Sequence, residues 1–208
     1  MTSTNAPNVA NVVKVIGIDA STTNIGWAIV GYHREHLIAS GVIALSGAGA
    51  FYDRLREGPR RLVRALKAAG IDGARIVVIE HSFFTNNPET GKKISMMIGA
   101  CLCALLKDVP AAREVSPTEV KMCFAGGGKA QKKDVVEAVR RRYGLSVESE
   151  DEADAIAIAS AFCKLHKQGH FEKKKAERAI RQKKVAEKRA ITKAAKAGKN
   201  SIKGELPL

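Results

Sequence analysis

Two short apolar segments of this chain are rich in β-branched residues, and each ends on a carboxylate. Residues 12–19 read VVKVIGID and end on Asp19, and residues 75–80 read RIVVIE and end on Glu80. Their length and composition are typical of fully buried central strands. An ionised carboxylate beside a core strand is costly unless cations, hydrogen bonds or a metal ion compensate it. The chain must therefore fold so that both acids find such a partner.

The hydrophobic pattern predicts five strands and several helices. After residues 12–19, strands over residues 25–32 and 36–45 follow short turns, which predicts an antiparallel meander. A helix is expected within residues 53–69, starting or kinking near Gly58-Pro59. Strand 75–80, a helix over 94–106 and a strand over 112–117 come next, and helices over 117–124, 132–143 and 151–165 end the pattern. The order βββαβαβα predicts an α/β fold with a mixed five-stranded sheet flanked by helices.

Charge divides the chain into a body and a tail. Residues 1–163 hold 20 Lys and Arg against 17 Asp and Glu, whereas residues 164–203 hold 15 against 3. We therefore expect a disordered lead-in over residues 1–11, one domain over residues 12–165 and a basic, partly helical or disordered tail over residues 166–208. The tail cannot bury a core of its own and is typical of a polyanion-binding extension, with a solvated helix that aids solubility as the alternative. Gly198 and Asn200 are expected to end its helix.

The sequence also indicates where the protein works. No uninterrupted apolar run approaches the ~18 residues of a membrane span, and the N-terminus lacks the pattern of a secretory signal. The four cysteines form no CxxC pair, which favours small buried hydrophobic residues over disulfides or zinc ligands; they are Cys101, Cys103, Cys123 and Cys163. We expect an intracellular, cytoplasmic protein in a reducing environment, associated with nucleoid or viral DNA.

A third acidic element follows in the segment EDEADAIAIASAF. Asp151 and Asp154 are three residues apart and so share one face of a helix. The apolar residues next to them are expected to pack against the core of the domain. If this helix packs across the sheet, both acids converge with Asp19 and Glu80 into a cluster that divalent cations would neutralise. Oxygen-only ligands select Mg²⁺ or Mn²⁺. Taken singly, the acids also fit structural roles: turn capping for Asp19, a salt bridge for Glu80 and a helix-dipole contact for Asp151.

Five sequence blocks resemble, in order, the motifs of RuvC-type Holliday junction resolvases. They are GIDASTTNIGWAIV, SGVI, IEHSFF with the following Asn86, SPTEVK with GGGKAQKKDV, and DEADAIAIA, within residues 14–162. The resemblance implies an RNase H-like fold and a homodimer that cuts a four-way DNA junction symmetrically with two Mg²⁺ or Mn²⁺ ions per site. It places the family's metal-binding acids on Asp19, Glu80, Asp151 and Asp154. The chain departs from the family in its long basic tail and in Asp19-Ala20-Ser21, where many members have Asp-Pro-Gly.

Several lysines match the family pattern too. The resemblance places Lys132 near the scissile phosphate, as a catalytic residue, and gives Lys121 as a second family lysine. Both would offset developing negative charge. Lys129 and Lys133 are neighbours that would substitute, and a solvated surface position is the alternative for each.

Adjacent aromatic residues follow the Glu80 strand on a polar segment. The resemblance places Phe83 as a wedge into unpaired bases at the junction centre, where stacking contributes about 1–3 kcal/mol, with Phe84 beside it at the DNA. In the alternative, Phe83 is a core residue at the end of the strand and Phe84 is exposed. The neighbouring His81 is assigned no role.

Other functions compete with junction resolution. The segment GIDASTTNIGW also resembles the phosphate-binding turn of sugar kinases and actin-like ATPases, which need a second lobe that 208 residues do not accommodate. The nuclease domain of RNA-guided DNA enzymes has a similar first motif, and RuvC-like RNA-processing nucleases are the main enzymatic alternative. A non-catalytic junction-binding protein is the third, although a polyanion binder gains nothing from a buried acidic cluster. For a dimer, we expect the surface to be residues 94–106, where Met96, Met97, Ile98 and Leu102 give more apolar area than one core face needs.

Overall fold

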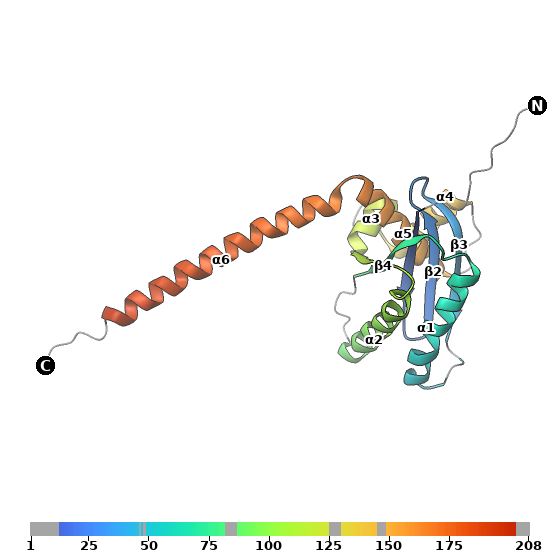
Figure 1. The fold of residues 1–208 in the computed structure, drawn as a ribbon, viewed down its shortest axis with the longest axis horizontal. Helices are drawn as coiled ribbons and strands as arrows, with labels where there is room; N and C mark the ends of the chain where they lie inside the picture. The colour runs from blue at the N-terminus through green and yellow to red at the C-terminus, as the bar shows by residue number, and fades with distance from the viewer. Residues whose placement is uncertain are drawn as a thin grey trace, which may run out of the picture. The chain divides into compact units, whose positions relative to one another are not determined.

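The computed structural model describes residues 13–45, 47, 49–81, 87–124, 130–144 and 149–202. Five strands form one sheet in the order β3-β2-β1-β4-β5 (Figure 1). The strands are β1 (Lys14–Ala20), β2 (Asn24–Gly31), β3 (His36–Ala44), β4 (Ala74–Glu80) and β5 (Ala112–Val115). The first three pair antiparallel, while β4 runs parallel to β1 and β5 parallel to β4. The expected mixed five-stranded sheet is confirmed.

In addition to the sheet, the described residues form six helices. They are α1 (Phe51–Ala68), α2 (Pro88–Leu105), α3 (Pro117–Phe124), α4 (Lys132–Tyr143), α5 (Glu150–Lys167) and α6 (His170–Ile202). Contacts within the chain form two compact units, one ending at Lys164 and one beginning at Leu165. Within the described residues, no helix is both long and apolar enough to cross a membrane.

The sheet separates two layers of helices in the first unit (Figure 1). Because side chains alternate along a strand, Ile16 and Ile18 of β1 face one side, where they share a core with Leu62 and Leu66 of α1 and with residues of α2. The intervening residues Gly17 and Asp19 face the other side, where α5 lies. This arrangement leaves Asp19 between the sheet and a helix.

Helix α1 differs from the expectation. It begins at Phe51, well before Gly58-Pro59, and continues through Pro59. The reason is burial: a Cβ atom on Gly58 would lie 3.0 Å from the Cδ1 atoms of both Ile25 and Leu45. Packing of this segment against the core outweighs the local cost of a proline inside a helix.

Helix α2 also begins earlier than expected, at Pro88, because the Asn87 side chain accepts hydrogen bonds from the backbone N–H groups of Glu89 and Thr90 and caps the helix. Met97 is fully buried in the core, so its assignment to a dimer surface was wrong. Ile98 and Leu102 pack against the same core and keep only part of their surface outside.

The cysteines are free, as expected, but not all are buried. Cys101 and Cys163 are in the interior, whereas Cys103 is exposed and Cys123 is half-buried. Cys103 lies two residues after Cys101 on α2, so it points away from the core on the opposite side of the helix.

The basic tail forms α6, a helix of 33 residues. The helix runs through Gly198 and Asn200 to Ile202, so the expected end at these residues was wrong. One glycine costs a helix only about 1 kcal/mol relative to alanine, and the alanines and lysines around Gly198 favour the helical state.

Candidate active site

The two strand-end acids lie next to each other because β1 and β4 are parallel neighbours. In their register Ile18 is opposite Ile79, and the next residues along the strands are Asp19 and Glu80. The carboxyl ends of parallel strands meet at one edge of the sheet, and residues in register share a face. Both carboxylates therefore lie at the same edge, on the face that α5 covers.

Helix α5 approaches the sheet closely at two glycines. A Cβ atom on Gly17 would lie 2.1 Å from the backbone oxygen of Ala155, and one on Gly26 would lie 1.9 Å from the backbone oxygen of Asp151. Gly26 is the cross-strand partner of Asp19. The first turn of α5 is thus held against the strand position that faces Asp19.

Asn24 fixes one of the α5 carboxylates. Its Nδ2 donates a hydrogen bond to Oδ2 of Asp151 at 2.9 Å, across 127 residues of sequence. The turn before Asn24 is itself ordered, because Ser21 Oγ accepts a hydrogen bond from the Asn24 backbone N–H at 2.9 Å. The β1–β2 hairpin therefore carries both an acid of the cluster and a residue that orients another.

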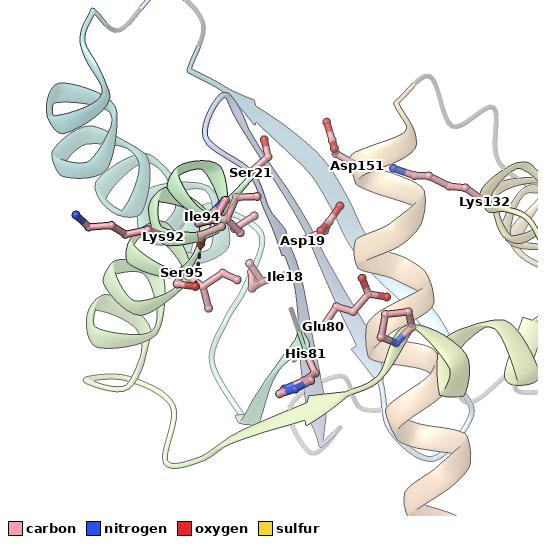
Figure 2. Close-up of a pocket in the computed structure, with 15 residues that line it drawn as sticks. Ile18, Asp19, Ser21, Glu80, His81, Lys92, Ile94, Ser95, Lys132 and Asp151 are labelled. Atoms are coloured by element: carbon pink, nitrogen blue, oxygen red, sulfur yellow. Dashed lines mark hydrogen bonds between the residues drawn. The ribbon is translucent and has the colours of Figure 1, made fainter. Parts of the chain in front are cut away.

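A cavity of about 580 Å³ opens at this edge of the sheet, with Asp19, Glu80, Asp151 and Lys132 in its lining. Figure 2 shows the carboxylates of Asp19, Glu80 and Asp151 facing the space between the sheet and α5, with Lys132 reaching toward it from α4. The opposite wall comes from α2 and includes Ile94, Ser95 and Ile98.

The environment of the acids makes their charged forms costly. Burial, with the nearby charges of Asp154 and Glu80, raises the pKa of Asp19 to about 7. Burial also raises the pKa of Glu80, with a further contribution from Asp154, and Lys132 and Lys121 oppose this rise. The pKa of Asp154 is raised by burial although its hydrogen bond with Lys132 acts in the other direction. The four acids therefore form one electrostatic cluster that lacks enough positive charge.

Lys132 is the main cation of this cluster. Its Nζ lies 2.9 Å from Oδ2 of Asp154 and 3.4 Å from Oε2 of Glu150. Burial lowers the pKa of Lys132, but the hydrogen bond with Asp154 and the charges of Asp154, Asp19 and Glu150 outweigh this effect and raise it. Lys121 acts on Glu80 through its charge. Lys133 is exposed on α4, and within the described part of the chain it makes no ion pair with these acids.

The carboxylate oxygens of the cluster suit a divalent cation, although they are not close enough together to coordinate one. Four neighbouring carboxylates, of which Asp19, Glu80 and Asp154 have raised pKa values, are a typical environment for an oxygen-bound ion such as Mg²⁺. Among the described residues, however, no three His, Cys, Asp or Glu side chains are arranged closely enough to hold a metal ion. Asp154 is paired with Lys132 instead. Coordination at about 2.1 Å therefore requires small side-chain movements within the cluster.

Some predicted site residues fall elsewhere. Phe83, Phe84 and Lys129 lie outside the described residues. His81 points away from the carboxylates in Figure 2, and its Nδ1 lies 2.9 Å from Oε2 of Glu114. Asn24 and Glu150 also belong to this site, and neither was predicted from the sequence. The signals in the sequence were a polar residue at the start of β2 and a further acid in EDEAD. Their place in the site follows only from the packing of α5 against the sheet.

Comparison with known proteins gives a family match. The family described as "Crossover junction endodeoxyribonuclease RuvC" matches residues 15–162. A protein of that name from Alkalilimnicola ehrlichii is 33% identical over 157 residues, which cover 74% of this chain and 91% of the relative. The match includes all four acids of the cluster.

Solved structures show the same fold. The structure of Thermus thermophilus RuvC matches with a TM-score of 0.64 and 26% identity, covering 76% of this chain and 98% of the other. A structure described as T. thermophilus RuvC in complex with Holliday junction substrate also has a TM-score of 0.64, at 24% identity, and covers 76% of this chain and 97% of its own.

Proposed function

Because this chain belongs to the RuvC family of crossover junction endodeoxyribonucleases, we propose that it resolves four-way DNA junctions by hydrolysing phosphodiester bonds in opposed strands. The family match agrees with the resemblance found in the sequence motifs. The observation that carries the proposal for this chain is the electrostatic cluster of Asp19, Glu80, Asp151 and Asp154 beside an open cavity. In a protein that only bound DNA, such negative charge facing the phosphates would lower the affinity for DNA.

The four acids are the proposed ligands of two Mg²⁺ or Mn²⁺ ions. When bound, the ions would activate a water for in-line attack on phosphorus and stabilise the leaving oxygen. Asp19 and Glu80 come from the rigid sheet, and Asp151 and Asp154 from the helix that packs on it. Asn24 holds Asp151 in one orientation, which limits the movement needed for coordination.

Lys132 and Lys121 have the position and charge to act on the substrate. Lys132 is half exposed at the cavity, so its ammonium group can move from Asp154 to a phosphate oxygen once other cations neutralise the acids. The charge of Lys121 acts on Glu80 and lowers its pKa. We assign both to neutralising negative charge on the scissile phosphate.

The remaining DNA contacts follow from the family motifs. Phe83 is the proposed wedge at the junction centre, with Phe84 beside it, and Lys129 and Lys133 are proposed phosphate contacts. Since two opposed strands are cut, the enzyme is proposed to act as a homodimer with two sites related by a twofold axis. Its DNA substrate places it inside a cell.

The test is cleavage of a labelled four-way junction with a mobile core. We expect paired cuts in opposed strands with Mg²⁺ and none after chelation. A structured RNA of similar size serves as the competing substrate. Preferential cleavage of the RNA would favour an RNA-processing nuclease, and junction binding without cleavage in any divalent ion would favour a binding protein.

A further inference from the structure

Helix α6 lies outside the family match, which ends at residue 162. The relative from A. ehrlichii is matched over 91% of its own length by 74% of this chain. The function of α6 is therefore not explained by membership of the family and has to be inferred from its own residues.

The helix is strongly basic and exposed over most of its described length. Residues 170–192 contain nine Lys and Arg against three Glu, and every side chain from 175 to 192 is exposed. A helix that buries nothing gains no stability from packing, and like charges three and four residues apart destabilise it. It needs a partner that carries negative charge.

The cations are concentrated on one face. At 100° per residue, six of the nine fall within an arc of about 140°, and we call this set the cationic face: Lys174, Lys175, Arg178, Arg181, Lys188 and Arg189. Within the described part of the chain, Arg178, Arg181 and Lys188 form no ion pair. The opposite side carries only three cations, Lys173, Lys183 and Lys184, together with alanines such as Ala179 and Ala190. The asymmetry indicates docking along one side of the helix.

The apolar residues of α6 do not favour a protein groove or a membrane. The exposed large hydrophobic residues of the helix are Ile180, Val185 and Ile191. Val185 lies about 140° around the helix from Ile180, so the three form no continuous stripe, whereas amphipathic docking needs an apolar stripe about 100° wide. Charge, and not apolar area, is the feature that α6 offers.

We propose that the cationic face of α6 binds the phosphate backbone of duplex DNA, in addition to the phosphates that the first unit contacts. From Lys174 to Arg189 the face extends about 22 Å, along which duplex DNA carries about thirteen phosphates. The choice of DNA over another polyanion rests on the proposed function. The contact is independent of sequence and of catalysis, because backbone contacts carry no base readout.

The test compares two triple variants of the full-length protein with the same loss of charge. The face variant is Arg178→Gln, Arg181→Gln and Lys188→Gln, and the matched control is Lys173→Gln, Lys183→Gln and Lys184→Gln, which lie on the other side of the helix. Glutamine has nearly the helix propensity of lysine and arginine, and circular dichroism checks that α6 is kept.

Binding to a plain duplex of about 30 base pairs, roughly twice the length of α6, is measured by fluorescence anisotropy over a series of salt concentrations in chelator. The face variant should have a slope of log K against log salt shallower by about 2.7, and a Kd raised at least about tenfold at low salt. The control should change the slope by less than about 1.

Equal changes in both variants would mean that α6 acts only through its net charge, and no change in either would mean that its partner is not DNA. Either result overturns the proposal. Junction cleavage by the face variant, measured at saturating protein, should keep its cut positions. If the wild-type protein does not cleave the junction at all, this would count against the proposed function, but it would not affect the result for duplex binding.

Discussion

The position of Asp19 between the sheet and α5 makes the charged form of its carboxyl unfavourable. Burial and three neighbouring acids raise its pKa to about 7, whereas in an unfolded chain the pKa of this carboxyl would have its ordinary value of 3.8. Such a residue destabilises the metal-free fold at neutral pH, which is typical of a functional site rather than of a stabilising one.

This shift predicts how stability depends on pH. Since the folded-state pKa is the higher one, the folded protein binds the extra proton between about pH 4 and 7, and stability falls as pH rises through this window. Thermal unfolding in chelator should therefore give a lower Tm at pH 8 than at pH 5. Asp19→Asn should flatten the profile, and Mg²⁺ should raise the wild-type Tm at pH 8. A Tm that rises steadily across the window, with no effect of Asp19→Asn, would contradict the raised pKa.

Asn24 is expected to act as a positioning residue for Asp151. Asn24→Ala should weaken Mn²⁺ binding by about tenfold, since groups that orient metal ligands typically contribute 10–100-fold. Isothermal titration in the absence of DNA measures this directly. The control is Asn87→Ala, which removes a helix cap and should lower stability by about 1 kcal/mol while leaving Mn²⁺ affinity unchanged. Equal metal affinity in both variants would reduce Asn24 to a structural role.

At the scale of elements, the site depends on how closely α5 lies on β1 and β2. Gly17→Ala should destabilise the protein by about 3 kcal/mol, because its Cβ would meet the Ala155 backbone oxygen and α5 must shift. Gly99→Ala is the matched control: this helical glycine of α2 has open space around it, so alanine should stabilise by roughly 0.5–1 kcal/mol. Urea unfolding of both variants measures the difference, and equal effects would refute the close contact.

Much of the fold could be predicted from the sequence, because the strands and most helices follow the hydrophobic period. The four acids could be found as well, since a carboxylate at the end of a buried strand is costly and conspicuous. The predictions that failed depended on packing. Gly58-Pro59 stays helical because the core covers it, and Met97 is buried because its side of α2 packs into the core below the sheet. The role of Asn24 could not be predicted, since it depends on a contact across 127 residues of sequence.

At the scale of the whole molecule, symmetric cutting requires two sites. We expect light scattering at micromolar concentration to give twice the mass of one 22.3 kDa chain, with and without DNA. With Met97 in the core, the surface that α2 offers is smaller than its sequence indicated, although Leu106, just after the helix, remains 45% exposed. A monomer under both conditions would mean that opposed strands are cut in separate encounters.

Metal-dependent cleavage by this protein is proposed to depend on the acidic cluster at Asp19. The most direct measurement is single-turnover cleavage of a labelled four-way junction in Mg²⁺ by Asp19→Asn, beside junction binding measured in chelator. Asp108→Asn, which removes an exposed ion pair with Lys67, is the control and should cleave normally. We expect Asp19→Asn to lose at least about a hundredfold in cleavage rate and to bind the junction as well as the wild type or more tightly, because less negative charge faces the phosphates. Undiminished cleavage by Asp19→Asn would contradict it.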